Sequence, residues 1–99
     1  MVQEIDDSFT FGFRAVRDKA PKASGVYTIY TSRRWLYVGE SEDIRQSLFE
    51  HLNEPSTCLA RRGPLSFSFE IVALEQRIDR KNALVAALVP ACNPAAPAR

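Results

Sequence analysis

The stretch GVYTIYTSRRWLYVGESEDIRQSLFEHLN, residues 25–53, constrains the fold more than any other part of the sequence. Residues 25–31 and 35–39 are rich in β-branched and aromatic residues, and the short polar run SRR separates them. This pattern predicts a β-hairpin. Alternation places two sets of side chains on opposite faces of the first strand: Val26, Thr28 and Tyr30 on one, and Tyr27, Ile29 and Thr31 on the other.

An amphipathic helix is predicted directly after the hairpin. Ser41 is a favourable N-cap residue, and the acidic residues that follow it lie where the helix dipole favours negative charge. The positions that share the inward face are Ile44, Leu48, His51 and Leu52. Pro55 predicts the end of this helix.

A third strand and a last helix complete the predicted domain. Residues 65–73, LSFSFEIVA, alternate strictly, and the inward positions are Leu65, Phe67, Phe69, Ile71 and Ala73. Residues 76–89 predict a helix that Pro90 ends, with apolar positions at Ile78, Val85, Leu88 and Val89. With a linker or short helix at residues 56–64, the order is β-β-α-(α)-β-α. We therefore expect an α+β fold with a small three-stranded antiparallel or mixed sheet flanked by helices.

The length of 99 residues predicts one domain. Residues 1–19 are expected to be a lead-in or arm, residues 20–93 the domain, and residues 94–99 a loose tail. Within the lead-in, the alternating Phe9, Phe11 and Phe13 predict an extended arm, whereas RAVRDKA could instead open a helical turn.

Charge argues against a general electrostatic attraction to nucleic acid. Thirteen Lys and Arg residues against twelve Asp and Glu give a net charge of +1, so nucleic-acid binding would need a local basic patch. Arg33 and Arg34 beside Trp35, at the hairpin tip, combine cations for phosphate with an aromatic ring for stacking. Arg61 and Arg62 form a second pair, and Arg77, Arg80 and Lys81 form a third group. Dispersed surface charge is the alternative.

A cytoplasmic protein without a membrane span is expected. The N-terminus lacks the apolar region of a secretory signal, and no run of apolar residues is long enough to cross a bilayer. Cys58 and Cys92 have no partner at zinc-ligand spacing. We interpret them as free thiols, with a single disulfide as the alternative.

Several separated motifs together resemble the GIY-YIG nuclease domain. They are APKASGVYTIY at residues 20–30, YVG at residues 37–39, the charged helix ending in HL, and Pro90-x-x-Asn93. The resemblance covers residues 20–93, most of the chain. It implies the fold of that family and metal-dependent cleavage of a DNA phosphodiester, with Mg²⁺ or Mn²⁺ as cofactor. In the family, a motif tyrosine helps to activate water, a helix arginine steadies the phosphate, and a glutamate on the last helix holds the metal.

Two of these functional positions are substituted in this sequence. The positions that match are Tyr27, Tyr37, Gly25, Gly39, His51 and Asn93. The arginine position holds Ser47, and Arg45 lies about 200° away around the helix. The glutamate position holds Lys81, whose ammonium has no lone pair for a cation. The sequence thus predicts that Tyr27, Tyr37 and His51 remain from an active site that has lost its cutting chemistry and its metal.

Three functions remain open from the sequence. The first is a catalytically silent module of bacterial type that binds DNA or a protein partner, and in which both tyrosines only pack. The second is an active endonuclease whose ligands come from other positions, such as Glu40 with Asp43 or Glu50, or from a second subunit. The third is an interaction domain without nucleic acid. A Ser47–His51 nucleophile pair is also geometrically possible. No sequence feature specifies an oligomeric state.

Overall fold

The computed structural model describes residues 8–60 and 63–93. Within them, one antiparallel sheet has the strand order β1-β4-β2-β3. The strands are β1 (Phe9–Thr10), β2 (Gly25–Tyr30), β3 (Trp35–Ser41) and β4 (Ser66–Ile71). The predicted α+β class and the hairpin of β2 and β3 are confirmed. The sheet has one strand more than predicted, because residues Phe9–Thr10 of the expected extended arm pair with β4, with Phe9 opposite Phe67.

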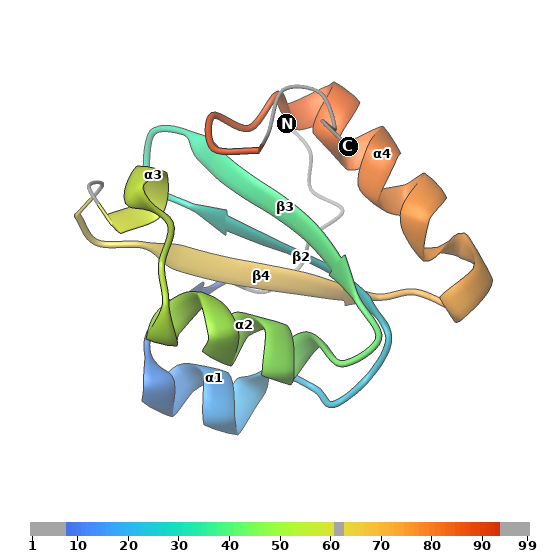
Figure 1. Ribbon diagram of the computed structural model, residues 1–99, viewed down its shortest axis with the longest axis horizontal. Coiled ribbons are helices and arrows are strands. Elements are labelled where there is room, and N and C mark those ends of the chain that lie inside the picture. The colour runs from blue at the N-terminus through green and yellow to red at the C-terminus, as the bar shows by residue number, and fades with distance from the viewer. Residues whose placement is uncertain (1–7, 61–62, 94–99) are drawn as a thin grey trace.

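Helices cover both faces of this sheet. Helices α1 (Phe13–Lys19) and α2 (Ile44–Asn53) pack on one face, and α4 (Arg77–Leu88) packs on the other (Figure 1). The short helix α3 (Thr57–Ala60) follows α2, and the 3₁₀ turn η1 (Leu74–Gln76) precedes α4. Both alternatives for residues 9–19 are realised in succession, first a strand and then a helix.

The core has two parts, one on each face of the sheet. The larger part lies between the sheet and helices α1 and α2 and contains Val16, Ala20, Tyr27, Ile29, Leu36, Ile44, Leu48, Leu59 and Phe67. The smaller part lies beneath α4 and contains Val26, Val38 and Leu84. The two faces predicted for β2 are thus confirmed, since Tyr27 and Ile29 face α2 whereas Val26 faces α4.

Helix α2 begins two residues later than predicted, because its N-cap is Asp43 and not Ser41. Asp43 is the N-cap, and its carboxylate accepts a hydrogen bond of 3.1 Å from the backbone N–H of Gln46. Ser41 is instead the last residue of β3, because the strand continues beyond the glycine. The inward face is as predicted, with Ile44 and Leu48 buried.

Four apolar residues that we expected to face the core are exposed, namely Ile71, Ala73, Ile78 and Val89. Ile71, Ile78 and Val89 have exposed fractions of 64%, 59% and 74%. Ile71 ends β4 where the sheet stops, and Val89 is the left-handed C-cap of α4 at φ 47°. The residue of α4 that is buried is Leu84.

A disulfide joins Cys58 of α3 to Cys92, which follows α4. The interpretation as free thiols is therefore wrong. The two cysteines are 34 positions apart and meet because both segments lie beside β3, where the backbone N–H groups of Ala91 and Cys92 donate to Trp35 and Leu36. Disulfides are rare in cytosolic proteins, which weighs against the cytoplasmic expectation.

Some expectations concern residues outside the described ranges. These are the start of the lead-in (residues 1–7), the pair Arg61 and Arg62, and the tail (residues 94–99). In the part of the chain that the structure describes, no helix has the length and apolar character needed to cross a membrane.

Candidate functional site

Three rings from β2, β3 and α2 form an aromatic cluster on one face of the sheet. In the β2–β3 register, Tyr27 lies opposite Gly39 and Ile29 lies opposite Tyr37. Directly paired residues share a face, so Tyr27 and Tyr37 are diagonal neighbours with ring centroids 6.1 Å apart. The ring of His51 comes from α2 and lies 5.6 Å from Tyr27 and 4.9 Å from Tyr37. The structure thus brings these three predicted site residues together.

Gly39 is required by the position of the Tyr27 ring. A Cβ atom on Gly39 would lie 2.4 Å from both the hydroxyl oxygen and the ring carbon Cζ of Tyr27. Contacts this short do not occur between non-bonded atoms, so a side chain at position 39 would displace the ring. This motif glycine therefore gives Tyr27 the space it needs to reach His51.

Tyr27 and His51 are joined by a hydrogen bond of 2.9 Å between the hydroxyl oxygen and Nε2. Burial raises the pKa of Tyr27 far above its usual range, and the negative charges nearby add to this effect. Burial also lowers the pKa of His51, although Glu50 opposes it. Tyr27 therefore keeps its proton and the His51 imidazole is neutral, and the direction of the hydrogen bond between them is set by which ring nitrogen of His51 carries the proton.

This protonation pattern predicts acid sensitivity. Because the pKa of folded His51 lies below the unfolded value of 6.5, the unfolded state binds the proton first as the pH falls. Its contribution to stability is present above about pH 6.5 and is lost as the pH falls through the folded pKa. We expect the free energy of unfolding, measured by urea denaturation, to decrease below about pH 6.5.

His51 is the only histidine of the chain, which makes a simple control possible. The variant His51→Gln keeps a polar side chain but cannot titrate, so its unfolding free energy should vary less with pH between about 5 and 6.5. Equal slopes in the two proteins would contradict a neutral, partly buried His51.

A polar cleft of about 620 Å³ lies beside the N-terminus of α2. Of the described residues, those lining it are Glu40, Ser41, Glu42, Asp43, Gln46, Ser47, Glu50 and Arg77. Ser47, which stands at the arginine position, donates to the hydroxyl of Ser41 at 2.7 Å, and Ser41 donates to the carbonyl of Asp43 at 2.8 Å. The Ser47 hydroxyl is thus directed to the end of β3 rather than to His51, which gives no support to a Ser47–His51 nucleophile pair.

Arg77 is the residue of α4 that enters this cleft. Its Nε donates to Glu40 at 2.5 Å, and a terminal nitrogen donates to the hydroxyl of Ser24 at 3.4 Å. The side chains of Arg77 and Glu40 are only 16% and 27% exposed. Lys81, the position that the motif assigned to the metal ligand, follows one turn later and is not among the described residues that line the cleft.

The donor set of the cleft does not fit a bound divalent cation. Glu40 is paired with Arg77, Asp43 caps α2, and Glu50 accepts a hydrogen bond of 3.3 Å from Gln46. Across residues 8–60 and 63–93, no group of three or more His, Cys, Asp or Glu side chains is placed to hold a metal ion. The guanidinium also repels a cation beside the one carboxylate that it neutralises.

The remaining predicted residues lie away from the cleft. Arg45 donates to the carbonyl of Ala20 at 2.8 Å, on the α1 side of α2, as its helical angle predicts. Arg33 and Arg34 are exposed at the hairpin tip, whereas the ring of Trp35 packs 4.8 Å from that of Tyr30. Asn93 binds the backbone of β3, accepting from Val38 N–H at 2.8 Å and donating to its carbonyl at 2.9 Å.

The sequence interpretation placed Arg77 with Arg80 and Lys81 in a third candidate group for nucleic-acid contact, with dispersed surface charge as the alternative, whereas Arg77 lies in the cleft. A signal was present, because Arg77 precedes Lys81 by four residues and shares its helix face. The position of the acidic Glu40 directly after the motif glycine Gly39 was a second signal. Pairing across 37 positions depends on how α4 docks on β3, and no local pattern encodes this.

No protein-family model matches the chain, and no curated protein matches it either. Solved structures of the GIY-YIG N-terminal endonuclease domain of UvrC from Thermotoga maritima are similar to it. The domain bound to its catalytic divalent cation, magnesium, gives a TM-score of 0.65 at 20% identity, covering 80% of this chain and 96% of that one. A tyrosine-to-phenylalanine mutant of the same domain gives 0.65 at 19% identity, covering 81% and 96%.

Proposed function

Because the chain has the GIY-YIG fold, we propose that it is a nuclease-like module that associates with DNA and does not cleave it. The observation that carries this proposal is the ion pair of Arg77 and Glu40 in the cleft. In the similar UvrC domain a catalytic divalent cation is bound. Here a fixed guanidinium neutralises the carboxylate that directly follows the YVG motif.

Charge in the cleft also disfavours a phosphodiester substrate. Four carboxylates, those of Glu40, Glu42, Asp43 and Glu50, line it with one guanidinium. A phosphate group entering this cleft would meet a net negative charge, and no described cation there is free of a carboxylate partner. Catalysis of phosphoryl transfer depends on cations held against the equatorial oxygens of the phosphate. The cleft instead presents a net negative charge to a phosphate.

We expect no nicking of supercoiled plasmid by the chain in the presence of Mg²⁺ or Mn²⁺, measured by gel electrophoresis over several hours. Tyr27→Phe is the control, because it removes the hydroxyl that a hydrolytic role would need but keeps the ring. Metal-dependent nicking that disappears in this variant would overturn the proposal. It would instead support an active endonuclease in which the Tyr27–His51 hydrogen bond acts with relocated ligands.

Two double variants test which residue of α4, Arg77 or Lys81, prevents the binding of a divalent cation. Ser47→Arg combined with Arg77→Glu restores a cation on α2 and places two carboxylates together, whereas Ser47→Arg combined with Lys81→Glu leaves the Arg77–Glu40 pair intact. Titration calorimetry with Mn²⁺ should detect binding to the first variant and not to the second. The reverse order would show that Lys81, and not Arg77, occupies the metal position.

A further inference from the structure

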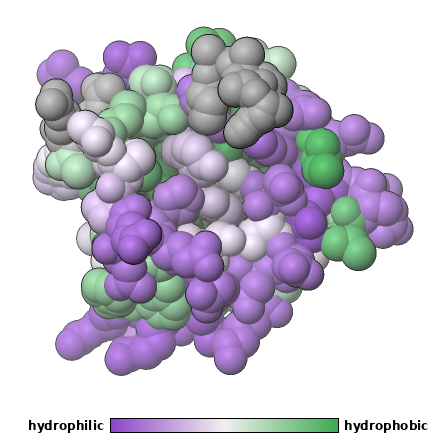
Figure 2. All heavy atoms as spheres, viewed as in Figure 1, coloured by the Kyte–Doolittle hydropathy of each residue, from purple (hydrophilic) through white to green (hydrophobic). Residues whose placement is uncertain are grey.

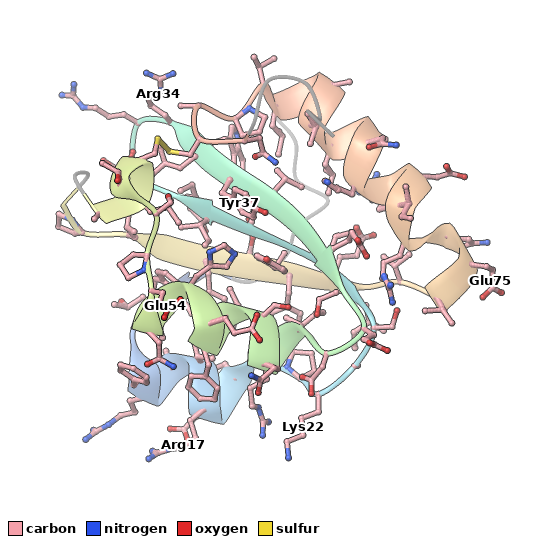
Figure 3. The ribbon with its side chains drawn as sticks, in the orientation of Figure 1. Arg17, Lys22, Arg34, Tyr37, Glu54 and Glu75 are labelled. Atoms are coloured by element: carbon pink, nitrogen blue, oxygen red, sulfur yellow. A yellow bond between two sulfur atoms is a disulfide. The ribbon has the colours of Figure 1, made fainter. Side chains whose placement is uncertain are left out.

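Among residues 8–60 and 63–93, the exposed cations are concentrated on α1 and the residues that follow it. Arg14, Arg17, Lys19 and Lys22 all have exposed side chains, and Asp18 is the one carboxylate between positions 13 and 22. This segment therefore carries four positive charges against one negative charge, in a protein whose net charge is only +1. Arg17 and Lys22 extend away from the body of the protein, below α1 and α2 (Figure 3).

The pKa of the Asp18 carboxyl shows the effect of these cations. Arg17 binds it at 2.8 Å through Nε, and both side chains remain exposed. The hydrogen bond from Arg17 lowers the pKa of the Asp18 carboxyl, and the charges of Arg14 and Lys19 lower it further. The single acid of the segment is thus surrounded by cations and does not neutralise the surface.

The other groups of cations that the structure describes carry less positive charge that is not compensated by a carboxylate. On α4, Arg77 is paired with Glu40 and Arg80 with Glu70 at 2.7 Å. The hairpin tip has two exposed arginines, and Figure 3 places Arg34 at the opposite end of the molecule from Arg17 and Lys22. The cleft itself is acidic. Net positive charge is therefore found on the α1 segment and not on the lining of the cleft.

The chemistry of the α1 surface fits a polyanion better than another folded protein. Protein interfaces are depleted of lysine and carry an apolar core. On α1 itself, Phe13 is 56% exposed and its ring stacks on that of Phe49 of α2, whereas the lowest part of the surface in Figure 2 is hydrophilic. Helix α1 is about 10 Å long, and over that length a DNA duplex presents roughly six phosphate charges. Four cations on one short segment match this charge density.

We propose that α1 and the residues after it dock on the phosphate backbone of duplex DNA through Arg14 and Arg17 on one side of the helix and through Lys19 and Lys22 at its C-terminal end. Arg17 and Lys19 lie about 200° apart around the helix axis, so these are two neighbouring groups of contacts. This inference rests on the proposed DNA association and names the surface responsible. Contacts of this kind read the backbone and not the base sequence. Binding is therefore sequence-independent and decreases steeply with salt.

Fluorescence anisotropy with a labelled 20-base-pair duplex, at several NaCl concentrations, tests the surface. The variant Arg14→Gln/Arg17→Gln removes two charges and retains good helix formers. We expect its affinity to fall by about tenfold or more, and its log–log salt slope to become shallower by roughly 1.8, since each lost phosphate contact removes about 0.9. A second variant, Lys19→Gln/Lys22→Gln, should behave in the same way.

Arg33→Gln/Arg34→Gln is the matched control, because it removes the same charge from the hairpin tip. We expect it to change affinity by less than about twofold. A loss confined to the hairpin variant would overturn the α1 assignment while leaving DNA association intact. Failure of the unaltered chain to bind duplex at any salt concentration would overturn both proposals. Stronger binding to anionic phospholipid vesicles than to duplex would likewise overturn DNA as the partner. Circular dichroism melting verifies that each variant folds.

Discussion

Loss of the disulfide between Cys58 and Cys92 is expected to lower the free energy of unfolding by about 3–4 kcal/mol. The bond closes a loop of 34 positions and so restricts the unfolded chain. Chain-entropy arithmetic for a loop of that length gives this magnitude. For a small domain with a total stability of about 5–15 kcal/mol, this is a large fraction.

Urea denaturation with and without a thiol reductant measures this effect. The oxidised chain should unfold at a clearly higher urea concentration than the reduced chain. The double variant Cys58→Ser/Cys92→Ser serves as control, because it should resemble the reduced protein and be insensitive to reductant. An unchanged midpoint on reduction would mean that the cross-link contributes nothing.

Replacing Gly25 by alanine should destabilise the fold by about 3 kcal/mol, at the upper end of the usual cost of overpacking. A Cβ atom there would lie 2.2 Å from the carbonyl oxygen of Glu70 and 3.0 Å from Cα of Ile71. Both atoms belong to the backbone of β4, which pairs with β2 at this position. Relief would require the two strands to separate, since no flexible side chain can yield instead.

The chain offers a matched control in Gly12, where a Cβ atom would meet nothing within 4 Å. Gly12 is the extended N-cap of α1 at φ −156°, so alanine is sterically permitted there. We expect Gly12→Ala to cost less than about 1 kcal/mol. Thermal unfolding of the two variants makes the comparison. Equal losses would contradict the steric explanation of the first motif glycine.

The elements that could be predicted are those encoded by local periodicity. The period of two in residues 25–30 and the spacing of Ile44 and Leu48 predicted the hairpin, the helix and their buried faces, because each depends on nearby residues only. Tyr27, Tyr37 and His51 were grouped by the family resemblance, and the structure brings them together. Once the hairpin pairs and α2 covers it, three positions on these elements must meet.

What could not be predicted depends on contacts between distant segments. Arg77 reaches Glu40 only through the docking of α4, and Cys58 meets Cys92 only because α3 and the segment after α4 both pack on β3. The prediction that Ile78 and Val89 face the core was wrong, because it rested on their apolar character alone and exposed apolar residues are common. Periodicity also does not indicate where a helix leaves the core.

The segment that follows α4 has a consequence for how the protein behaves at high concentration. Strand β3 lies at the end of the sheet, and exposed strands of this kind are templates for pairing with another chain. Here the backbone N–H groups of Ala91 and Cys92, together with the amide of Asn93, already occupy hydrogen-bonding groups along β3. The disulfide holds this cover in place. The residues that follow α4 therefore also protect the β3 edge of the sheet from aggregation through strand addition.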